Sequence, residues 1–154
     1  MIRENWCRER GGTITLKQLS VFLEYREGRL EDVLNLLKEE NINIISLSLA
    51  DTSEYGMLRL LVNDPEKGRK ALKENGFSAT LSDIVAVTLP HRVGGLQQVL
   101  HTLYHAGINI EYMYALCTTT DEAAIAIKPS DLEKAQKVLE DSGAHFFSEK
   151  DMFL

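Results

Sequence analysis

The sequence predicts an α+β protein built from one six-element unit that occurs twice, in the order strand, helix, strand, strand, helix, strand. The first observation behind this prediction is an internal repeat, because Gly28 and Gly94 lie 66 residues apart and the same offset relates further identical pairs. These pairs are Val21 and Val87, Leu23 and Leu89, Arg26 and Arg92, Leu30 and Leu96, Val33 and Val99, and Asn43 and Asn109. The second observation is that alternating apolar runs and helical stripes follow one another in the same order in both halves.

The first half shows this order through local signals. An alternating apolar run predicts a strand at Lys17–Glu24, and leucines and valines at helical spacing predict a helix that ends at Asn41. Asp64 before Pro65 predicts the start of a second helix, which ends at Gly76. The remaining strands are expected at Asn43–Ala50, Tyr55–Asn63 and Phe77–Leu81.

The second half repeats these signals. A strand is expected at Ile84–Pro90, and the helix after it ends at Gly107. Ser130 and Glu133 have the spacing of a capping box, which predicts that Ser130 caps a helix ending at Gly143. The remaining strands are expected at Asn109–Cys117, Ala123–Lys128 and Ala144–Ser148.

Each unit folds naturally into a ferredoxin-like sandwich, in which two helices cover one face of a four-stranded sheet. We expect an N-terminal extension at 1–16, a first domain at 17–82 and a second at 83–154, packed with pseudo-twofold symmetry. Several strands are apolar on both faces, so the bare sheet faces are expected to meet each other or a second chain. Tyr112 and Tyr114 alternate on one strand face, which favours packing in the sheet or at such an interface over a role as a pocket wall.

Composition excludes several classes of function. A net charge of -6 without a basic stripe argues against nucleic-acid binding, and no apolar run approaches the roughly 18–20 residues of a membrane span. The two cysteines lie far apart and do not form a disulfide framework or a metal motif, which favours a cytoplasmic protein. The N-terminus has no apolar stretch typical of a secretory signal.

The repeated glycine turn is the strongest candidate for a binding site. The first N–H groups of a helix have no partner within the helix and carry the positive end of its dipole. A glycine at this position either allows the positive φ of a tight turn or lets a small carboxylate approach those donors, and both explanations suit Gly28 and Gly94. Arg26 and Arg92 recur beside the two turns and can pair with a carboxylate, while Asn43 and Asn109 offer amide donors and acceptors.

The segments "YREGRLEDVLNLLKEENINI" and "HRVGGLQQVLHTLYHAGINI" resemble the opening of ACT domains, small regulatory modules that bind amino acids. The resemblance covers residues 17–154 and implies a tandem ACT protein with its amino-acid ligand between modules. It places ligand contacts at Arg26, Glu27, Gly28, Arg29, Leu30, Asn43 and Ile44, and at Arg92, Val93, Gly94, Gly95, Leu96, Asn109 and Ile110. Glu27 would repel a carboxylate, which favours the second turn.

Enzymatic activity is not indicated, because no nucleophile, general base or metal cluster stands out. His101 and His105 lie one helical turn apart, but no third ligand accompanies them, so a solvated helix face is favoured and neither metal nor cofactor is expected. The sequence therefore predicts a non-catalytic amino-acid-binding regulator. Alternatives are an acylphosphatase-like enzyme using Arg92 and Asn109, or a ligand-free regulatory subunit of a biosynthetic enzyme. A partner enzyme and a homodimer remain open.

Overall fold

The computed structural model describes residues 14–51, 54–118, 121–149 and 151. Residues 1–13 of the expected extension lie outside the described part of the chain, and the first strand already begins at Leu16. The elements follow in the order β1 (Leu16–Glu24), α1 (Arg29–Glu39), β2 (Ile44–Asp51), β3 (Tyr55–Val62), α2 (Pro65–Glu74), β4 (Ser78–Pro90), α3 (Gly95–His105), β5 (Ile110–Thr118), β6 (Glu122–Pro129), α4 (Leu132–Asp141) and β7 (His145–Phe146).

Strand β4 belongs to both halves of the chain. Its first part, Ser78–Ile84, pairs with β1, and its second part, Val85–Pro90, pairs with β6. The prediction of separate strands at Phe77–Leu81 and Ile84–Pro90 was therefore wrong, because one strand of 13 residues runs through both. It stays unbroken because the exchange of partners at Ile84 and Val85 leaves no residue between the two ladders. The expected domain boundary after residue 82 falls inside this strand.

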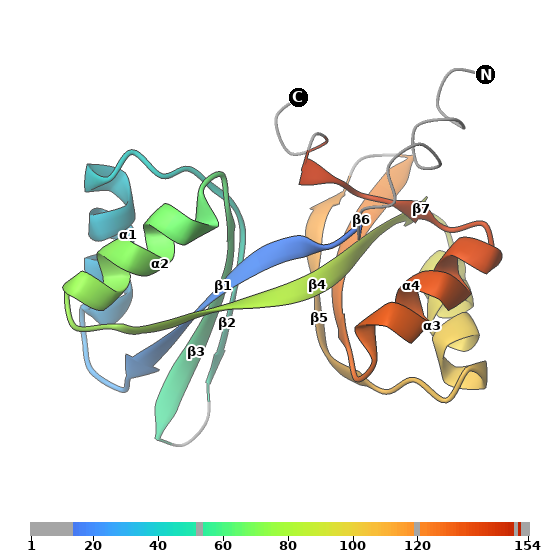
Figure 1. The fold of residues 1–154 in the computed structure, drawn as a ribbon, viewed down its shortest axis with the longest axis horizontal. Helices are drawn as coiled ribbons and strands as arrows, with labels where there is room; N and C mark the ends of the chain where they lie inside the picture. The colour runs from blue at the N-terminus through green and yellow to red at the C-terminus, as the bar shows by residue number, and fades with distance from the viewer. Residues whose placement is uncertain (1–13, 52–53, 119–120, 150, 152–154) are drawn as a thin grey trace.

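The strands form a curled antiparallel sheet in the order β2-β3-β1-β4-β6-β5, with β7 paired to β4. We call β1 to the first part of β4 the first module, and the second part of β4 to β7 the second module. Helices α1 and α2 lie on the outer side of the first sheet and α3 and α4 on the outer side of the second (Figure 1). The two sheets therefore face each other through their helix-free faces, and the predicted pair of ferredoxin-like modules is confirmed.

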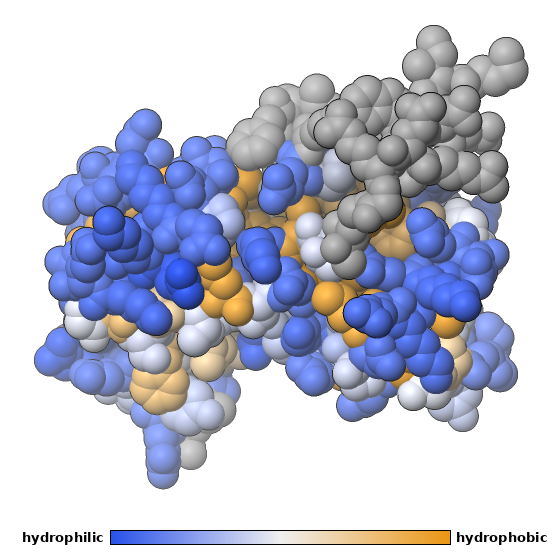
Figure 2. All heavy atoms as spheres, viewed as in Figure 1, coloured by the Kyte–Doolittle hydropathy of each residue, from blue (hydrophilic) through white to orange (hydrophobic). Residues whose placement is uncertain are grey.

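The alternation of β1 explains this packing. Leu19, Val21 and Leu23 point into the core under α1 and α2, whereas Leu16 belongs to a separate cluster between the sheets. That cluster also holds Leu61, Ile84, Ala86 and Ala126. Figure 2 shows apolar surface in the middle of the molecule, where the two modules meet. Apolar residues on both faces of a strand are thus buried on both sides within a single chain.

The helix boundaries confirm most of the predicted signals. Asp64 caps α2 by accepting a hydrogen bond from the Lys67 N–H at 3.1 Å. Asn41, with φ of 56°, and Gly107 take the left-handed conformation expected at the ends of α1 and α3. The prediction that Ser130 caps α4 was wrong. Asp131 caps this helix, and its carboxylate accepts a hydrogen bond from the Lys134 N–H at 3.0 Å.

Ser130 has a different role at the same junction. Its hydroxyl oxygen accepts a hydrogen bond from the backbone N–H of Asn109 at 3.1 Å, and its own N–H donates to the Asn109 carbonyl at 2.8 Å. The side chain that seemed to cap the helix is therefore occupied by the start of β5. The capping role falls to Asp131 because its carboxylate lies next to the free N–H groups of the first turn.

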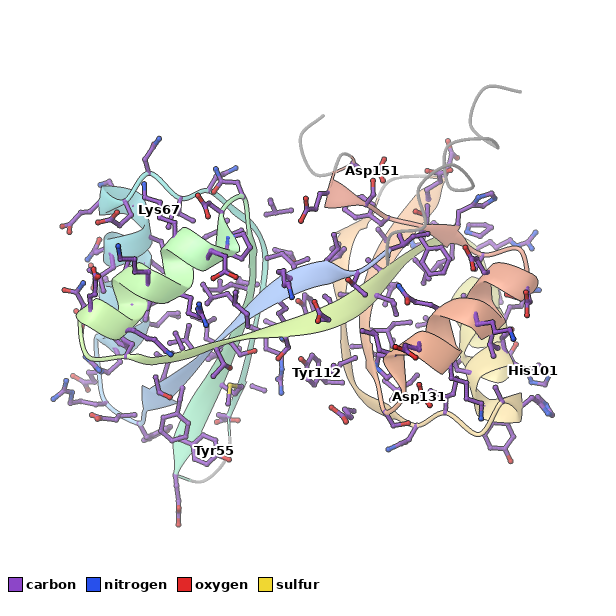
Figure 3. The ribbon with its side chains drawn as sticks, in the orientation of Figure 1. Tyr55, Lys67, His101, Tyr112, Asp131 and Asp151 are labelled. Carbon is purple, nitrogen blue, oxygen red and sulfur yellow. The ribbon has the colours of Figure 1, made fainter. Side chains whose placement is uncertain are left out.

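A polar network crosses the apolar interface between the sheets. Gln18 of β1 is fully buried, and its amide nitrogen donates to the hydroxyls of Ser20 at 3.0 Å and Tyr112 at 2.7 Å. The Tyr114 hydroxyl donates to the Gln18 amide oxygen at 2.7 Å. The Arg59 guanidinium lies 3.7 Å from the centroid of the Tyr112 ring, and Figure 3 shows Tyr112 between the two sheets. The expectation that the tyrosines pack at an interface is confirmed.

Candidate functional site

The two glycine turns have the same backbone geometry. Gly28 immediately precedes α1 with φ of 81°, and Gly94 immediately precedes α3 with φ of 82°. In both turns the next residue closes the loop, with the Arg29 N–H 3.4 Å from the Arg26 carbonyl and the Gly95 N–H 3.0 Å from the Arg92 carbonyl. The left-handed conformation is the physical reason for the repeated glycine, because side chains with a β-carbon adopt it at a cost.

The second glycine of the second turn has a separate cause. A β-carbon on Gly95 would overlap the carbonyl oxygen of Pro90, so the strand and the helix approach each other too closely there for any side chain. The first module carries Arg29 at the equivalent position. Gly95 is therefore explained by packing within the second module, independently of any ligand.

A cavity of about 540 Å³ lies at the turn of the first module. It is open to solvent where β1 runs into α1, and the ends of β2 and β3 form its other side. It is lined by Leu23, Glu24, Tyr25, Arg26, Glu27, Arg29, Leu30, Leu49, Asp51 and Gly56. Leucine side chains thus combine with two guanidinium groups and three carboxylates around one cavity.

Arg29 is the most constrained charged group in this lining. Its side chain is only 18% exposed, and its guanidinium carbon lies 4.2 Å from the centroid of the Phe77 ring. A long contact of 3.4 Å joins its Nη1 to Asp32. Its Nε atom is buried and has no hydrogen-bond partner among the described residues. Arg29 is therefore held in place beside the first turn of α1 by the Phe77 ring and Asp32.

Sequence reasoning missed six residues of this cavity. Leu23, Glu24 and Tyr25 directly precede the predicted turn, and the other three come from distant strands. Leu49 and Asp51 lie at the end of β2, and Gly56 lies at the start of β3. The antiparallel register places them there, since Gly56 is paired with both Leu23 and Asp51. The alternation of β2 predicts the strand itself but does not show which end faces the turn.

The predicted residues Asn43 and Ile44 lie at the opposite end of the first module. Ile44 is paired with Val62 at the far end of β3, so the length of that strand, roughly 20 Å, separates it from the turn. The Asn43 N–H donates to the Asn63 side-chain oxygen at 2.9 Å. Of the first-module candidates, the structure therefore brings together Arg26, Glu27, Arg29 and Leu30 with the Gly28 turn.

The second module separates its candidates in the same way. Gly94 follows Pro90, which pairs with Glu122 at one end of β6, whereas Ile110 pairs with Pro129 at the other end. Asn109 and Arg92 therefore lie far apart, and the phosphate cradle that an acylphosphatase-like activity would need from them is not formed. The remaining candidates differ in burial, since Leu96 packs against the core of the second module and Val93 is fully exposed.

Other chemistry has little support in the described part of the chain. The imidazole rings of His101 and His105 lie edge to face on the exposed side of α3, with their centroids 4.1 Å apart. Within the described ranges, no three His, Cys, Asp or Glu side chains are grouped so that they could hold a metal ion. None of the described helices is both long and apolar enough to cross a membrane.

Comparison with known proteins identifies the family. The model of the ACT domain pair matches residues 14–154, and the chain belongs to this family. The solved structure of protein BT0572 from Bacteroides thetaiotaomicron is 38% identical, with a TM-score of 0.85 over 91% of this chain and 96% of that one. A search of curated proteins found no match.

More distant structures share the fold. The regulatory subunit of aspartate kinase from Thermus thermophilus, in a ligand-free form, has a TM-score of 0.63 at 16% identity over 85% of this chain and 95% of that one. The corresponding subunit from Thermus flavus has a TM-score of 0.59 at 18% identity over 84% and 94%. Membership of the ACT family supports a regulatory, ligand-binding role for this chain.

Proposed function

We propose that this protein is a non-catalytic cytoplasmic regulator that binds an amino acid in the cavity of its first module. The observation that carries the proposal is that charges of both signs surround one cavity at the N-terminus of α1. They belong to Arg26, Arg29, Glu24, Glu27 and Asp51. Guanidinium groups and the N-terminus of a helix suit a carboxylate, whereas carboxylates suit an ammonium group. An amino acid carries both charges a few ångströms apart.

Arg29 is the expected partner of the ligand carboxylate. Its positively charged side chain lines the cavity, and the dipole of α1 adds positive potential at the same place. Glu27 repels the ligand carboxylate, but the three carboxylates of the lining also attract the ligand ammonium, and this attraction offsets the repulsion. Asp51 is the best placed of them to do so without competing with α1, since it lies across the cavity on β2.

The first module is a better candidate than the second. The second module has Pro90 and Val93 where the first has Glu24 and Glu27, and its β5 ends with Cys117 and Thr118 where β2 ends with Asp51. The second turn therefore lacks counterparts of Glu24, Glu27 and Asp51, the three carboxylates that line the cavity of the first module. We expect one amino acid to bind per chain.

Regulation would follow from a population shift. A ligand that binds one arrangement of the modules more tightly than another stabilises that arrangement, and a partner protein can respond to it. Strands β1 and β3 carry both the cavity and the inter-sheet network, through Leu23 and Gly56 on one side and Gln18 and Arg59 on the other. An enzyme of amino-acid metabolism is the expected partner, by analogy with the kinase subunits of the same fold.

A thermal-unfolding screen against the common amino acids tests the proposal. A ligand at a hundred times its dissociation constant adds about 2.7 kcal/mol to the free energy of unfolding, which raises the melting temperature by several degrees for a chain of this size. A rise with at least one amino acid, at one equivalent per chain by calorimetry, is expected. No rise with any of them at millimolar concentration would contradict the proposal.

Two variants locate the site. Asp51→Asn is expected to weaken binding at least tenfold, since it removes the charge opposite the ligand ammonium while keeping the shape of the side chain. Glu54→Gln is the matched control, because Glu54 is an exposed acid near Asp51 that does not line the cavity. Equal affinity of the two variants would place the ligand elsewhere.

A further inference from the structure

The side chains that line the cavity differ sharply between its loop and its inner wall. The charged groups come from residues 24–29 and from Asp51, and they match the two charges common to all amino acids. The inner wall is formed by Leu23, Leu30 and Leu49. This wall faces the part of the ligand that distinguishes one amino acid from another.

Leu49 is more exposed to solvent than its place on the core side of the sheet would suggest. It points to the helix-covered side of the sheet, because it is paired with Leu58, which is fully buried in the core of the first module. It is nevertheless 49% exposed. Leu23, beside it in the cavity, is 4% exposed and fixed in the core. The wall therefore combines a rigid leucine with one that has apolar surface still to bury.

Gly56 keeps this wall open. A β-carbon at Gly56 would lie 3.4 Å from the Leu49 Cδ1 atom and 3.7 Å from the Leu23 Cβ atom, so any larger side chain would fill the space between the two leucines. Gly56 does not have a positive φ, so its backbone conformation does not explain the glycine. Because Gly56 has no side chain, the apolar surface of Leu23 and Leu49 stays accessible from the cavity.

We propose that the ligand is an amino acid with an apolar aliphatic side chain, of the leucine, isoleucine or valine type, and that this side chain packs on Leu23, Leu30 and Leu49. The inference rests on the proposed function, since it assumes that an amino acid binds in this cavity. The charged side chains of lysine or aspartate would have to leave water for a leucine wall, which is unfavourable without a paired charge. Each methylene group that the ligand buries strengthens binding about fourfold.

The experiment measures the affinities of leucine, alanine, lysine and aspartate for the full chain by calorimetry. Leucine is expected to bind at least tenfold more tightly than alanine, and lysine and aspartate are expected to bind more weakly than leucine. Leu49→Ala is expected to weaken leucine binding about tenfold and to leave alanine binding unchanged. Because Leu49 is half exposed, this variant is expected to fold, and circular dichroism checks that it does.

Leu47→Ala is the matched control. Leu47 lies two residues away on the same face of β2 and is 48% exposed, but it does not line the cavity. If leucine affinity falls in Leu49→Ala and not in Leu47→Ala, the inference is supported. If lysine or aspartate binds more tightly than leucine, or both variants bind leucine equally, the inference is overturned while the proposed function stands. If none of the common amino acids binds, the proposed function fails as well.

Discussion

Gln18 is a single buried residue whose hydrogen bonds favour one relative placement of the two sheets. Its amide joins Ser20, Tyr112 and Tyr114 in the middle of an interface that is otherwise mostly apolar. A buried amide is costly without partners, and each of these hydrogen bonds requires one particular placement of the two sheets. The network therefore disfavours alternative placements that would leave the amide unpaired.

The ionisation of Tyr114 is a sensitive probe of this interface. Burial raises the pKa of the Tyr114 hydroxyl well above its usual value of about 10, the neighbouring Tyr112 raises it further, and Arg59 opposes the shift. The folded pKa exceeds the unfolded one, so the contribution to stability is complete below pH 10 and is lost as the pH rises through the folded pKa.

Spectroscopic titration of the tyrosines checks this prediction. Tyr114→Phe is expected to remove a tyrosine whose pKa is raised above its usual value, whereas Tyr104→Phe, which alters a side chain that is 76% exposed, is the control and is expected to leave that high-pH ionisation in place. If the high-pH ionisation persists in Tyr114→Phe, the Tyr114 hydroxyl is not buried between the sheets.

The glycines at the two turns predict different mutational costs. Gly28→Ala is expected to lower the free energy of unfolding by about 1–2 kcal/mol, because φ is positive and an added β-carbon would meet no atom within 4 Å. Gly95→Ala is expected to cost more, because the β-carbon would overlap the Pro90 carbonyl oxygen. Urea unfolding of both variants measures the difference, and a smaller loss in Gly95→Ala would argue against the close approach of β4 and α3.

At the scale of elements, the neighbouring side chains of Ser130 and Asp131 have different roles at the start of α4. Asp131→Ala is expected to lower the free energy of unfolding by about 1 kcal/mol, because it removes the acceptor for the Lys134 N–H. Ser130→Ala is expected to cost less, because the Asn109 N–H that it leaves is near solvent. Urea unfolding of the two variants decides between them. The opposite order would restore the capping box that the sequence suggested.

Strand β4 is the element that the repeat alone could not predict. Two repeats imply two strands with a connection between them, yet the closing strand of one unit and the opening strand of the next are the same strand. The local signals at its two ends correctly predict strand. The error lay at Ser82–Asp83, where hydrogen bonding to β1 continues without interruption until β6 takes over as partner.

For the whole molecule, the shared strand and the inter-sheet core predict a single cooperative unit. Ile84 lies in β4 where the partners change and is fully buried between the sheets. Ile84→Ala is expected to cost about 2–5 kcal/mol and to destabilise both modules equally.

Hydrogen exchange in α2 and α4 measures the two modules separately. Protection is expected to fall by the same factor in both helices of the Ile84→Ala variant, whereas Leu47→Ala, at a half-exposed position, is expected to change neither. A loss of protection confined to one module would show that the modules unfold independently.

The sequence by itself determined the repeated unit, the type and order of nearly all its elements, and the family, because these depend on local periodicity and on residues such as Gly28 and Gly94. It also indicated that the strands are buried on both faces. The tertiary structure decided the remainder, including the merging of two strands into β4 and the position of the cavity. Asp51 and Leu49 join Arg29 only because the antiparallel register of β2 and β3 returns the chain to the turn, and pairing between distant segments leaves no local mark in the sequence.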